Sequence, residues 1–194
     1  MNELAPGLSY WLAPHPAWEP GENWPQDVPC FRFVSPDGVV LIDPLLPPGS
    51  ENMFDADPPA RIVLTAPCHA RGTAQLVERY SVPVWARPGA RWHGPVLATT
   101  DELPAGIEAL LPDGDQDQAF LLLAEQRALI TGDILSGTSG RLRVFVDEQD
   151  REPFLAWLPR LLDLDVELVL IAHGPFVLEA ARARLRAAIG EARE

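Results

Sequence analysis

Residues 62–72 constrain the fold of this chain more than any other stretch of the sequence. A short β-branched run over 62–65 stops at a small polar loop, and a helical pattern follows over 73–80. A further apolar run lies at 82–86. This spacing predicts a strand, a loop, a helix and another strand, which together form a βαβ unit. Because the strands of such a unit are parallel, an α/β fold is indicated.

A β-hairpin is predicted just before this unit. Two apolar runs, 30–34 and 39–42, flank Ser35-Pro-Asp-Gly38, in which proline presets φ for a turn and glycine accepts the positive φ that closes it. The second run is apolar at every position, which predicts a strand buried on both faces. It is followed directly by Asp43, so an acidic side chain stands at the carboxyl end of a buried strand.

The second half of the chain alternates strand and helix patterns. We expect strands at 107–111, 119–123, 128–131, 141–146 and 166–172. We expect a helix at 150–164, kinked at Pro159, and a second helix at 176–192, with Leu178 in its apolar stripe. Together with the hairpin in the first half, this order predicts an α/β fold with mixed β-sheets.

The length of 194 residues is sufficient for a hydrophobic core, and we expect one domain over residues 1–194. Residues 1–29 are rich in proline and tryptophan. We expect a short strand near 8–12, followed by an irregular cover that packs on the domain. Its aromatic side chains are expected to seal one edge of the core, since buried aromatic area is mostly structural.

The composition excludes several classes of function. A formal net charge of −13 repels phosphate backbones, so no nucleic acid partner is expected. No apolar run approaches the roughly 18 residues of a membrane helix, so no membrane span is expected. Two cysteines, Cys30 and Cys68, are too few for a disulfide framework, and a signal-peptide pattern is missing, so we expect a cytoplasmic protein. All 15 basic residues are arginine, which excludes lysine-dependent chemistry.

Polar residues follow four of the predicted strands. They are Asp43, the loop after Thr65, Asp133 and His173. In α/β proteins, reactive side chains gather where strands end at one edge of a sheet. The four strand ends together therefore predict a functional site.

The motifs at these strand ends resemble those of the metallo-β-lactamase superfamily. Leu41-Ile-Asp-Pro44, Val63-Leu-Thr65, Leu129-Ile-Thr-Gly-Asp133 and Ala172-His-Gly174 follow one another in that family's order. The resemblance spans about residues 31–174. It implies a four-layer αββα sandwich with mixed β-sheets. It also implies a hydrolase site with one or two metal ions, commonly zinc, bound by His-x-His-x-Asp-His, a later histidine, the aspartate of Thr-Gly-Asp and a final histidine.

Most of the ligands that the resemblance implies are replaced in this chain. The four loop positions fall on Ala66, Cys68, Ala70 and Arg71, and the later histidine falls near Gly114. Only Asp133 and His173 match their motifs directly, with Cys68 as a possible substitute ligand. The resemblance therefore implies a largely lost metal site.

Two residues of the loop leave alternatives open. Arg71 cannot lose its proton and would repel a second metal ion, so we hypothesise that its guanidinium fills part of the emptied site and pairs with Asp133. If the loop is extended, Ala66 and Cys68 share one face and His69 takes the other. We then expect His69 to hydrogen-bond the loop, with a ligand role only if the register differs.

Two functions follow from these motifs. The first is a metallo-β-lactamase-fold protein without a working di-metal site, non-catalytic or altered to bind an unknown small molecule or protein partner, with no cofactor. The alternative is an atypical hydrolase of an ester, thioester, amide or phosphodiester, with a single zinc, manganese or iron ion held by Cys68, Asp133 and His173. A third, weaker possibility is a structural subunit that pairs with an intact homologue.

Overall fold

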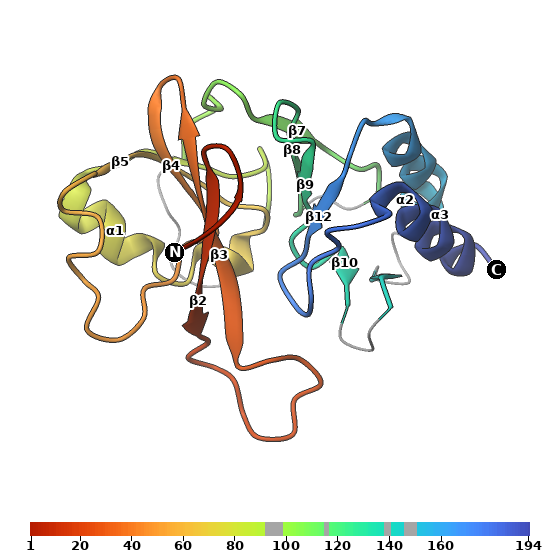
Figure 1. The fold of residues 1–194 in the computed structure, drawn as a ribbon, viewed down its shortest axis with the longest axis horizontal. Helices are drawn as coiled ribbons and strands as arrows, with labels where there is room; N and C mark the ends of the chain where they lie inside the picture. Colours follow the sequence, from red (N-terminus) through yellow and green to blue (C-terminus); the bar gives the residue numbers. More distant parts are fainter. Residues whose placement is uncertain (92–98, 115–116, 138–140, 146–150) are drawn as a thin grey trace.

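The computed structural model describes residues 1–91, 99–114, 117–137, 141–145 and 151–194. The described residues form two larger β-sheets and a two-stranded ribbon (Figure 1). The six-stranded sheet has the order β1 (Asn2–Ala5), β2 (Leu8–Pro14), β3 (Asp27–Ser35), β4 (Gly38–Ile42), β5 (Pro59–Val63) and β6 (Val84–Trp85). The four-stranded sheet has the order β12 (Leu168–Leu170), β9 (Ala128–Ile130), β8 (Phe120–Leu123) and β7 (Glu108–Leu110).

The elements around residues 62–72 agree with the sequence. The hairpin of β3 and β4 closes at the pair Ser35 and Gly38, and the helix α1 (Thr73–Tyr80) begins and ends at the expected residues. Strand β5 pairs in parallel with both β4 and β6, so the βαβ unit is confirmed. The strand ends at Val63 rather than at Thr65, which leaves Thr65 free to face the neighbouring strand ends.

The four-layer αββα sandwich is confirmed by the way buried side chains alternate along the strands. In β4, Leu41 packs toward α1, whereas Ile42 packs between the two sheets. In β8, Leu121 faces the same inter-sheet core, whereas Phe120 packs with α2 (Arg151–Trp157) and α3 (Ala181–Ala192). Figure 1 shows α1 on one outer face and α2 and α3 on the other. Both sheets are thus covered on both faces, as their nearly continuous apolar runs require.

Several elements of the second half differ from the sequence-based expectation. The helix expected at 150–164 is α-helical in α2 and continues as a 3₁₀ helix, η3 (Leu158–Asp163), because Pro159 cannot continue the α-helical hydrogen bonding. Helix α3 begins at Ala181, not at 176, because Val177 forms a bridge with Val169. The expected stripe position Leu178 is therefore exposed. Residue 150 lies outside the described residues.

The strand expected at 141–146 is short and belongs to the two-stranded ribbon. Strand β11 (Arg143–Val144) pairs antiparallel with β10 (Leu135–Ser136), an element that the sequence pattern did not indicate. Residue 146 lies outside the described residues. The ribbon follows Asp133 closely, so it lies beside the predicted site.

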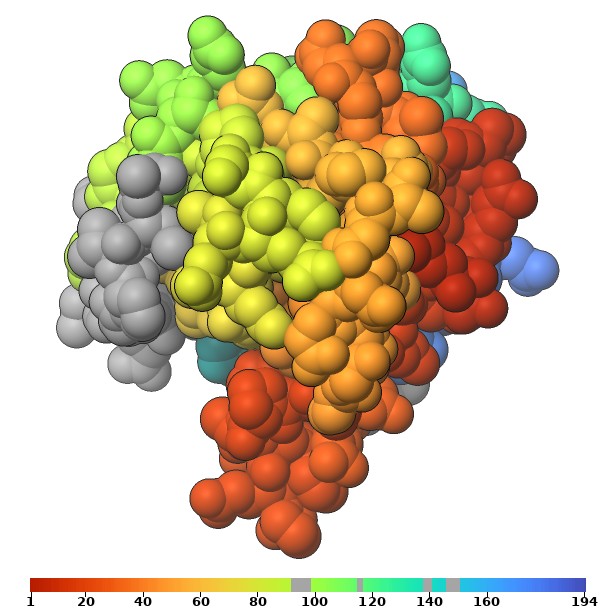
Figure 2. All heavy atoms as spheres, turned by 90° about the vertical axis from the view of Figure 1, so that its left-hand side faces the viewer, coloured from red at the N-terminus to blue at the C-terminus, as the bar shows by residue number. Residues whose placement is uncertain are grey.

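The N-terminal region contributes more to the sheet than expected. Residues 2–14 form the hairpin of β1 and β2, and only the segment 15–26 is irregular. This segment projects at the bottom of the molecule in Figure 1, and Figure 2, which shows the face with α1, places it below that face. In the described part of the chain, no helix is long and apolar enough to cross a membrane.

Candidate functional site

Asp43 joins the ends of two parallel strands. Its backbone N–H donates to the carbonyl oxygen of Val63 at 3.1 Å, and its own φ is +48°. Its buried carboxylate accepts the backbone N–H of Thr65 at 2.8 Å and the Thr65 hydroxyl at 2.5 Å. A buried carboxylate is stable only when its oxygens are satisfied in this way. Asp43 therefore supports the loop that follows β5.

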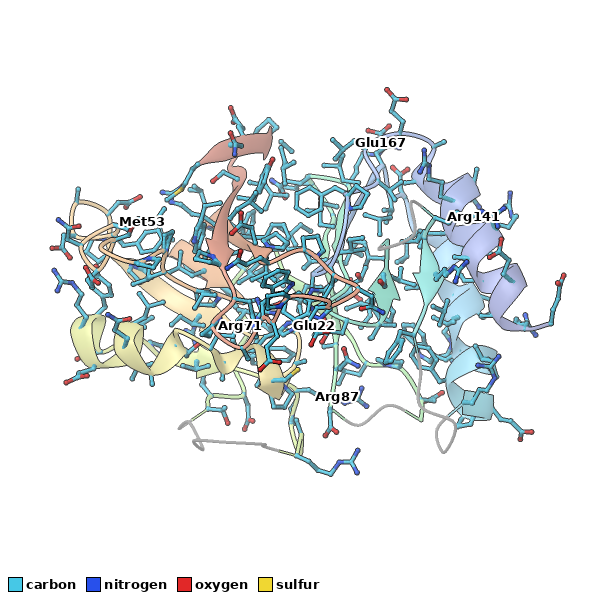
Figure 3. All side chains as sticks on the ribbon, turned by 90° about the horizontal axis from the view of Figure 1, so that it is seen from below. Glu22, Met53, Arg71, Arg87, Arg141 and Glu167 are labelled. Carbon is cyan, nitrogen blue, oxygen red and sulfur yellow. The ribbon has the colours of Figure 1, made fainter. Side chains whose placement is uncertain are left out.

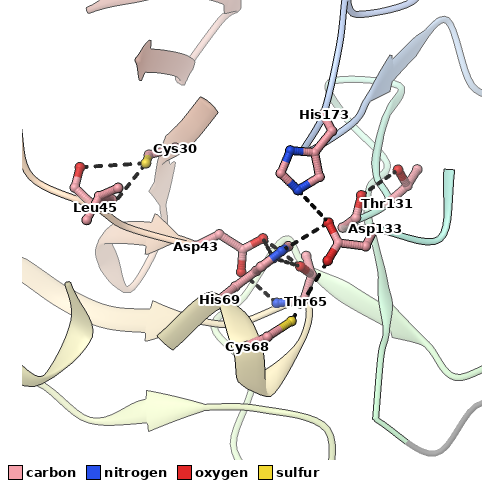
Figure 4. A network of polar contacts seen from close by, with 10 residues as sticks. Cys30, Asp43, Leu45, Thr65, Cys68, His69, Thr131, Asp133 and His173 are labelled. Atoms are coloured by element: carbon pink, nitrogen blue, oxygen red, sulfur yellow. Dashed lines mark hydrogen bonds and ion pairs between the residues drawn. The ribbon is translucent and has the colours of Figure 1, made fainter. Parts of the chain in front are cut away.

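His69 lies in the site rather than on the far side of the loop. Residues Pro67–Ala70 form a 3₁₀ turn, η1, with proline at its start, so the extended loop expected from the sequence is wrong. Proline favours the first turn of a helix, and at three residues per turn neighbouring side chains no longer alternate between two faces. His69 and Cys68 can therefore both reach the same site (Figure 4).

The ring of His69 spans the distance between two aspartates. Its Nδ1 lies 2.9 Å from a carboxylate oxygen of Asp43 and 2.9 Å from the Thr65 hydroxyl, and its Nε2 lies 3.2 Å from Oδ1 of Asp133. The expectation that His69 hydrogen-bonds the loop is thus confirmed. A carboxylate only accepts, so Nδ1 donates its proton to Asp43. The Nε2 atom facing Asp133 then either carries a second proton or offers a lone pair to a cation.

The other sheet supplies Asp133 and His173 from adjacent parallel strands, β9 and β12. The Nε2 atom of His173 lies 3.2 Å from Oδ1 of Asp133, and the thiol of Cys68 points to Oδ2 of Asp133 at 3.8 Å. Of the three residues predicted from the sequence to hold a metal, Cys68 and His173 each contact Asp133, but the cluster whose ligand atoms lie within 4.8 Å of one another is Cys68, His69 and Asp133, without His173. His69 is thus a donor that the extended-loop reasoning had placed elsewhere.

Gly132 allows the two sheets to meet at the site. It has a φ of +54°, and a Cβ atom there would lie 2.7 Å from the Thr65 hydroxyl oxygen. Nearby, the backbone N–H of Ala119 donates to the carbonyl oxygen of Thr65 at 2.8 Å. Glycine is thus required by both the backbone conformation and the space. The motif Thr-Gly-Asp positions Asp133 against the Thr65 end of the first sheet.

Charges in the site shift the pKa values of its groups. Burial alone would lower the pKa of His69, but the carboxylates of Asp133 and Asp43 outweigh it and raise this pKa to about 9. Partial burial alone would raise the pKa of Asp133, but His69 and His173 hold it far below its usual range. Desolvation of the sulfur, followed by the charge of Asp133, raises the pKa of the Cys68 thiol to about 12.

The hypothesis that Arg71 pairs with Asp133 is wrong. Among the described residues, Arg71 forms no ion pair, and its Nε and Nη1 atoms are buried without a hydrogen-bond partner. The chain turns away after η1, because the N–H of Gly72 donates to the carbonyl oxygen of Pro44 at 3.3 Å. The charge of Arg71 therefore acts on His69, Cys68 and the Cys30 thiol. Figure 3, in which the molecule is seen from below, shows Arg71 near the middle of the view.

The irregular segment 15–26 covers one side of the site. The ring of Trp24 lies 4.7 Å from that of His173 and 5.1 Å from that of His15, between centroids. The indole N–H of Trp18 donates to the carbonyl oxygen of Trp24 at 2.9 Å and holds the segment in place. Aromatic side chains were expected to seal the core, but Trp24 contacts a site residue instead. No pattern in the sequence signals this contact.

Comparisons with known proteins show the class to which this fold corresponds. No family model and no curated sequence matches the chain. The structure is similar to TTHA1623 in a di-iron-bound form, with 25% identity, a TM-score of 0.65, and 83% of this chain and 94% of that chain covered. It is also similar to the metallo-β-lactamase family protein TTHA1429 from Thermus thermophilus, with 19% identity, a TM-score of 0.69, and 98% and 81% covered.

A third similar structure is that of VMB-1 at pH 5.5, with 11% identity, a TM-score of 0.69, and 100% of this chain and 97% of that chain covered. The protein therefore has the metallo-β-lactamase fold, and the resemblance indicated by its motifs is confirmed. Within that class it is a divergent protein, with Ala66, Ala70 and Arg71 at positions where the resemblance implies metal ligands.

Among the described residues, one cluster of side chains could hold a metal ion. One ligand atom each from Cys68, His69 and Asp133 lies within 4.8 Å of the others, whereas His173 contacts Asp133 but is not part of this group. Tetrahedral zinc holds nitrogen and oxygen donors about 3.3 Å apart, and sulfur and oxygen donors about 3.6 Å apart. Both histidine Nε2 atoms lie 3.2 Å from Oδ1 of Asp133, close to the first value, whereas the 3.8 Å from the Cys68 sulfur is to the other oxygen, Oδ2. For a second ion, the loop offers alanine and a fixed positive charge.

Proposed function

We propose that this protein binds a single metal ion, with zinc as the best match, through His69, Asp133, His173 and Cys68, and that it is an atypical hydrolase of the metallo-β-lactamase fold. The observation that carries the proposal is the position of His69 between two carboxylates. Its Nδ1 is held by Asp43 at 2.9 Å, while Nε2 faces Asp133. Histidine ligands commonly donate their second ring N–H to a carboxylate in this way, which fixes the ring and its tautomer.

Each residue has a definite task in this proposal. Asp43 keeps the proton of His69 on Nδ1, so that the lone pair of Nε2 points into the site. Asp133 supplies the negative charge, and His173 approaches it from the second sheet. A bound ion would lower the pKa of a water molecule and polarise the ester, thioester, amide or phosphodiester to be cleaved. The di-iron-bound form of TTHA1623 supports a transition metal in a site of this fold.

A second function is favoured by a different observation. Because Asp133 and Asp43 raise the pKa of His69 to about 9, a metal-free site would hold a protonated His69 at neutral pH. The ring then donates to both carboxylates, and the site is satisfied without a cation. The protein would in that case be non-catalytic and would bind a small molecule or a protein partner beside Asp133 and His173.

Metal analysis separates the two functions. We expect purification without chelator, or reconstitution with zinc, to give about one ion per chain. His69→Ala and His173→Ala are expected to lose the ion. Asp43→Asn is expected to weaken zinc binding by about 10-fold to 100-fold, because the asparagine amide can donate to Nδ1 and shift the proton to Nε2. The matched control is Asp55→Asn, whose carboxylate contacts only Arg79 and Tyr80 in the described structure.

The measurements are metal content by mass spectrometry and zinc affinity by competition with a chromophoric chelator. A folded protein that takes up no zinc, manganese or iron would support the metal-free function. Equal zinc affinity of Asp43→Asn and Asp55→Asn would contradict the role given to His69.

A further inference from the structure

A cavity of about 480 Å³ opens beside the second-sheet side of the site. This volume is typical of pockets that hold a small molecule. The lining of the cavity includes Asp133 and His173, the residues Ser136, Arg143 and Phe145 of the ribbon and its flank, and Trp24. A ligand in this cavity would therefore contact the site directly.

The side chain of Arg143 lines this cavity. In the described part of the chain, its guanidinium forms no ion pair and no hydrogen bond, whereas the nearby Arg141 pairs with Glu191 at 3.6 Å. An unpaired guanidinium at a cavity wall is a fork of donors that fits a carboxylate.

Two aromatic rings form the apolar part of the cavity. Phe145 is 64% exposed, although its backbone N–H is held by the carbonyl oxygen of Ile134 at 2.8 Å. Trp24 is fixed on the other side by its packing against His173. Phe145 and Trp24 therefore give the cavity apolar surface beside Arg143.

We propose that this cavity binds a small organic carboxylate with an apolar body, in which Arg143 pairs with the carboxylate and Trp24 and Phe145 contact the body. A ligand with a single negative charge fits better than one with several. Asp133 lies in the same cavity, and the net charge of −13 repels polyanions. The inference deepens and rests on the proposed function, since it names the class of molecule that would reach Asp133 and His173.

The test compares two probes with the same apolar body, one of which ends in a carboxylate and the other in a neutral hydroxyl. Binding of 4-phenylbutyrate and of the neutral 4-phenylbutan-1-ol is measured by calorimetry or by ligand-observed NMR. We expect the carboxylate to bind at least about tenfold more tightly than the alcohol, because a hydrogen bond to a charged group stabilises more than a neutral one. Arg143→Gln should abolish this difference, and Phe145→Ala should weaken both probes.

The matched control is Arg186→Gln, which makes the same change of charge at an exposed position of α3. It should leave both affinities unchanged. Equal binding of the two probes, no binding of either, or equal effects of Arg143→Gln and Arg186→Gln would each overturn the proposal.

The same titrations are repeated on chelator-treated protein, which distinguishes failure of this inference from failure of the proposed function. If the protein takes up no metal but still binds the carboxylate through Arg143, the proposed metal site is refuted and the proposed carboxylate cavity is supported. If the protein binds one metal ion per chain but binds both probes equally, the metal site is supported and the carboxylate cavity is refuted.

Discussion

The two sides of the site are built differently. On the side of the six-stranded sheet, the side chains of Asp43 and His69 are 5% and 2% exposed, and the polar atoms of both are hydrogen-bonded. On the side of the four-stranded sheet, Asp133 and His173 are 31% and 20% exposed and line a cavity. The first side is therefore a rigid support, and the second side is where a ligand arrives. The loop of the rigid side is also where most of the ligands implied by the resemblance are replaced.

The largest expected effect comes from removing the support. Asp43→Ala leaves the Thr65 N–H, the Thr65 hydroxyl and His69 Nδ1 without their buried acceptor. We expect a loss of about 3 kcal/mol in the free energy of unfolding, measured by urea denaturation of metal-free protein. Asp133→Ala, on the open side, should cost less than half of this. Equal losses, or a greater loss for Asp133→Ala, would mean that the two sides do not differ as described.

A second variant tests the joint between the two sides. Gly132→Ala places a methyl group 2.7 Å from the Thr65 hydroxyl oxygen at a φ of +54°. We expect a loss of about 2 kcal/mol, from strain and from displacement of Thr65. The control is Gly190→Ala in α3, where a Cβ meets nothing within 4 Å. It should raise stability by about 0.5 to 1 kcal/mol. The idea of a tight joint fails if both variants shift the unfolding midpoint in the same direction.

On the side of the six-stranded sheet, we expect replacement of Arg71 to raise the free energy of unfolding rather than lower it. Its Nε and Nη1 atoms are buried without partners, which costs desolvation that no hydrogen bond offsets. Arg71→Met keeps the length of the side chain and removes the charge. We expect it to stabilise the metal-free protein by about 1 kcal/mol in the same urea measurement. A loss of stability would show that the guanidinium is paired in solution.

The two cysteines are used to test solvent access rather than stability, because a reagent in solution can alkylate only a thiol that it can reach. Cys30 is fully buried, and its burial raises the pKa of its thiol to about 12. Cys68 is exposed as a residue, but partial desolvation of its sulfur and the charge of Asp133 raise the pKa of its thiol to about 12 as well. Because the thiolate is the reactive form, alkylation of Cys68 by iodoacetamide should be slow at pH 8 and rise about tenfold per pH unit from 8 to 10. Cys30 should react only after unfolding. Mass spectrometry of the native protein checks this; rapid labelling of Cys30 at pH 8 would contradict its burial.

Much of the fold and part of the site could be predicted from local patterns. The turn residues at 35–38, the apolar run 39–42 and the helical spacing at 73–80 depend on neighbours in the sequence, and each element formed as expected. Asp133 and His173 were identified because each lies at a predicted strand end and matches a motif of the family that the sequence resembles. The ribbon of β10 and β11 was not foreseen, since two-residue strands carry too little periodicity to detect.

The sequence by itself determined the class of fold, the strand ends that meet at the site and the replacement of most metal ligands. Only the tertiary structure decided that His69 faces Asp133, that Arg71 does not pair with it, and that Trp24 packs on His173. The physical reason is the range of the interactions. Periodicity and turn chemistry act over a few residues, whereas the 3₁₀ turn at Pro67–Ala70 directs His69 toward a carboxylate 64 positions away. That contact exists only after the two sheets have packed.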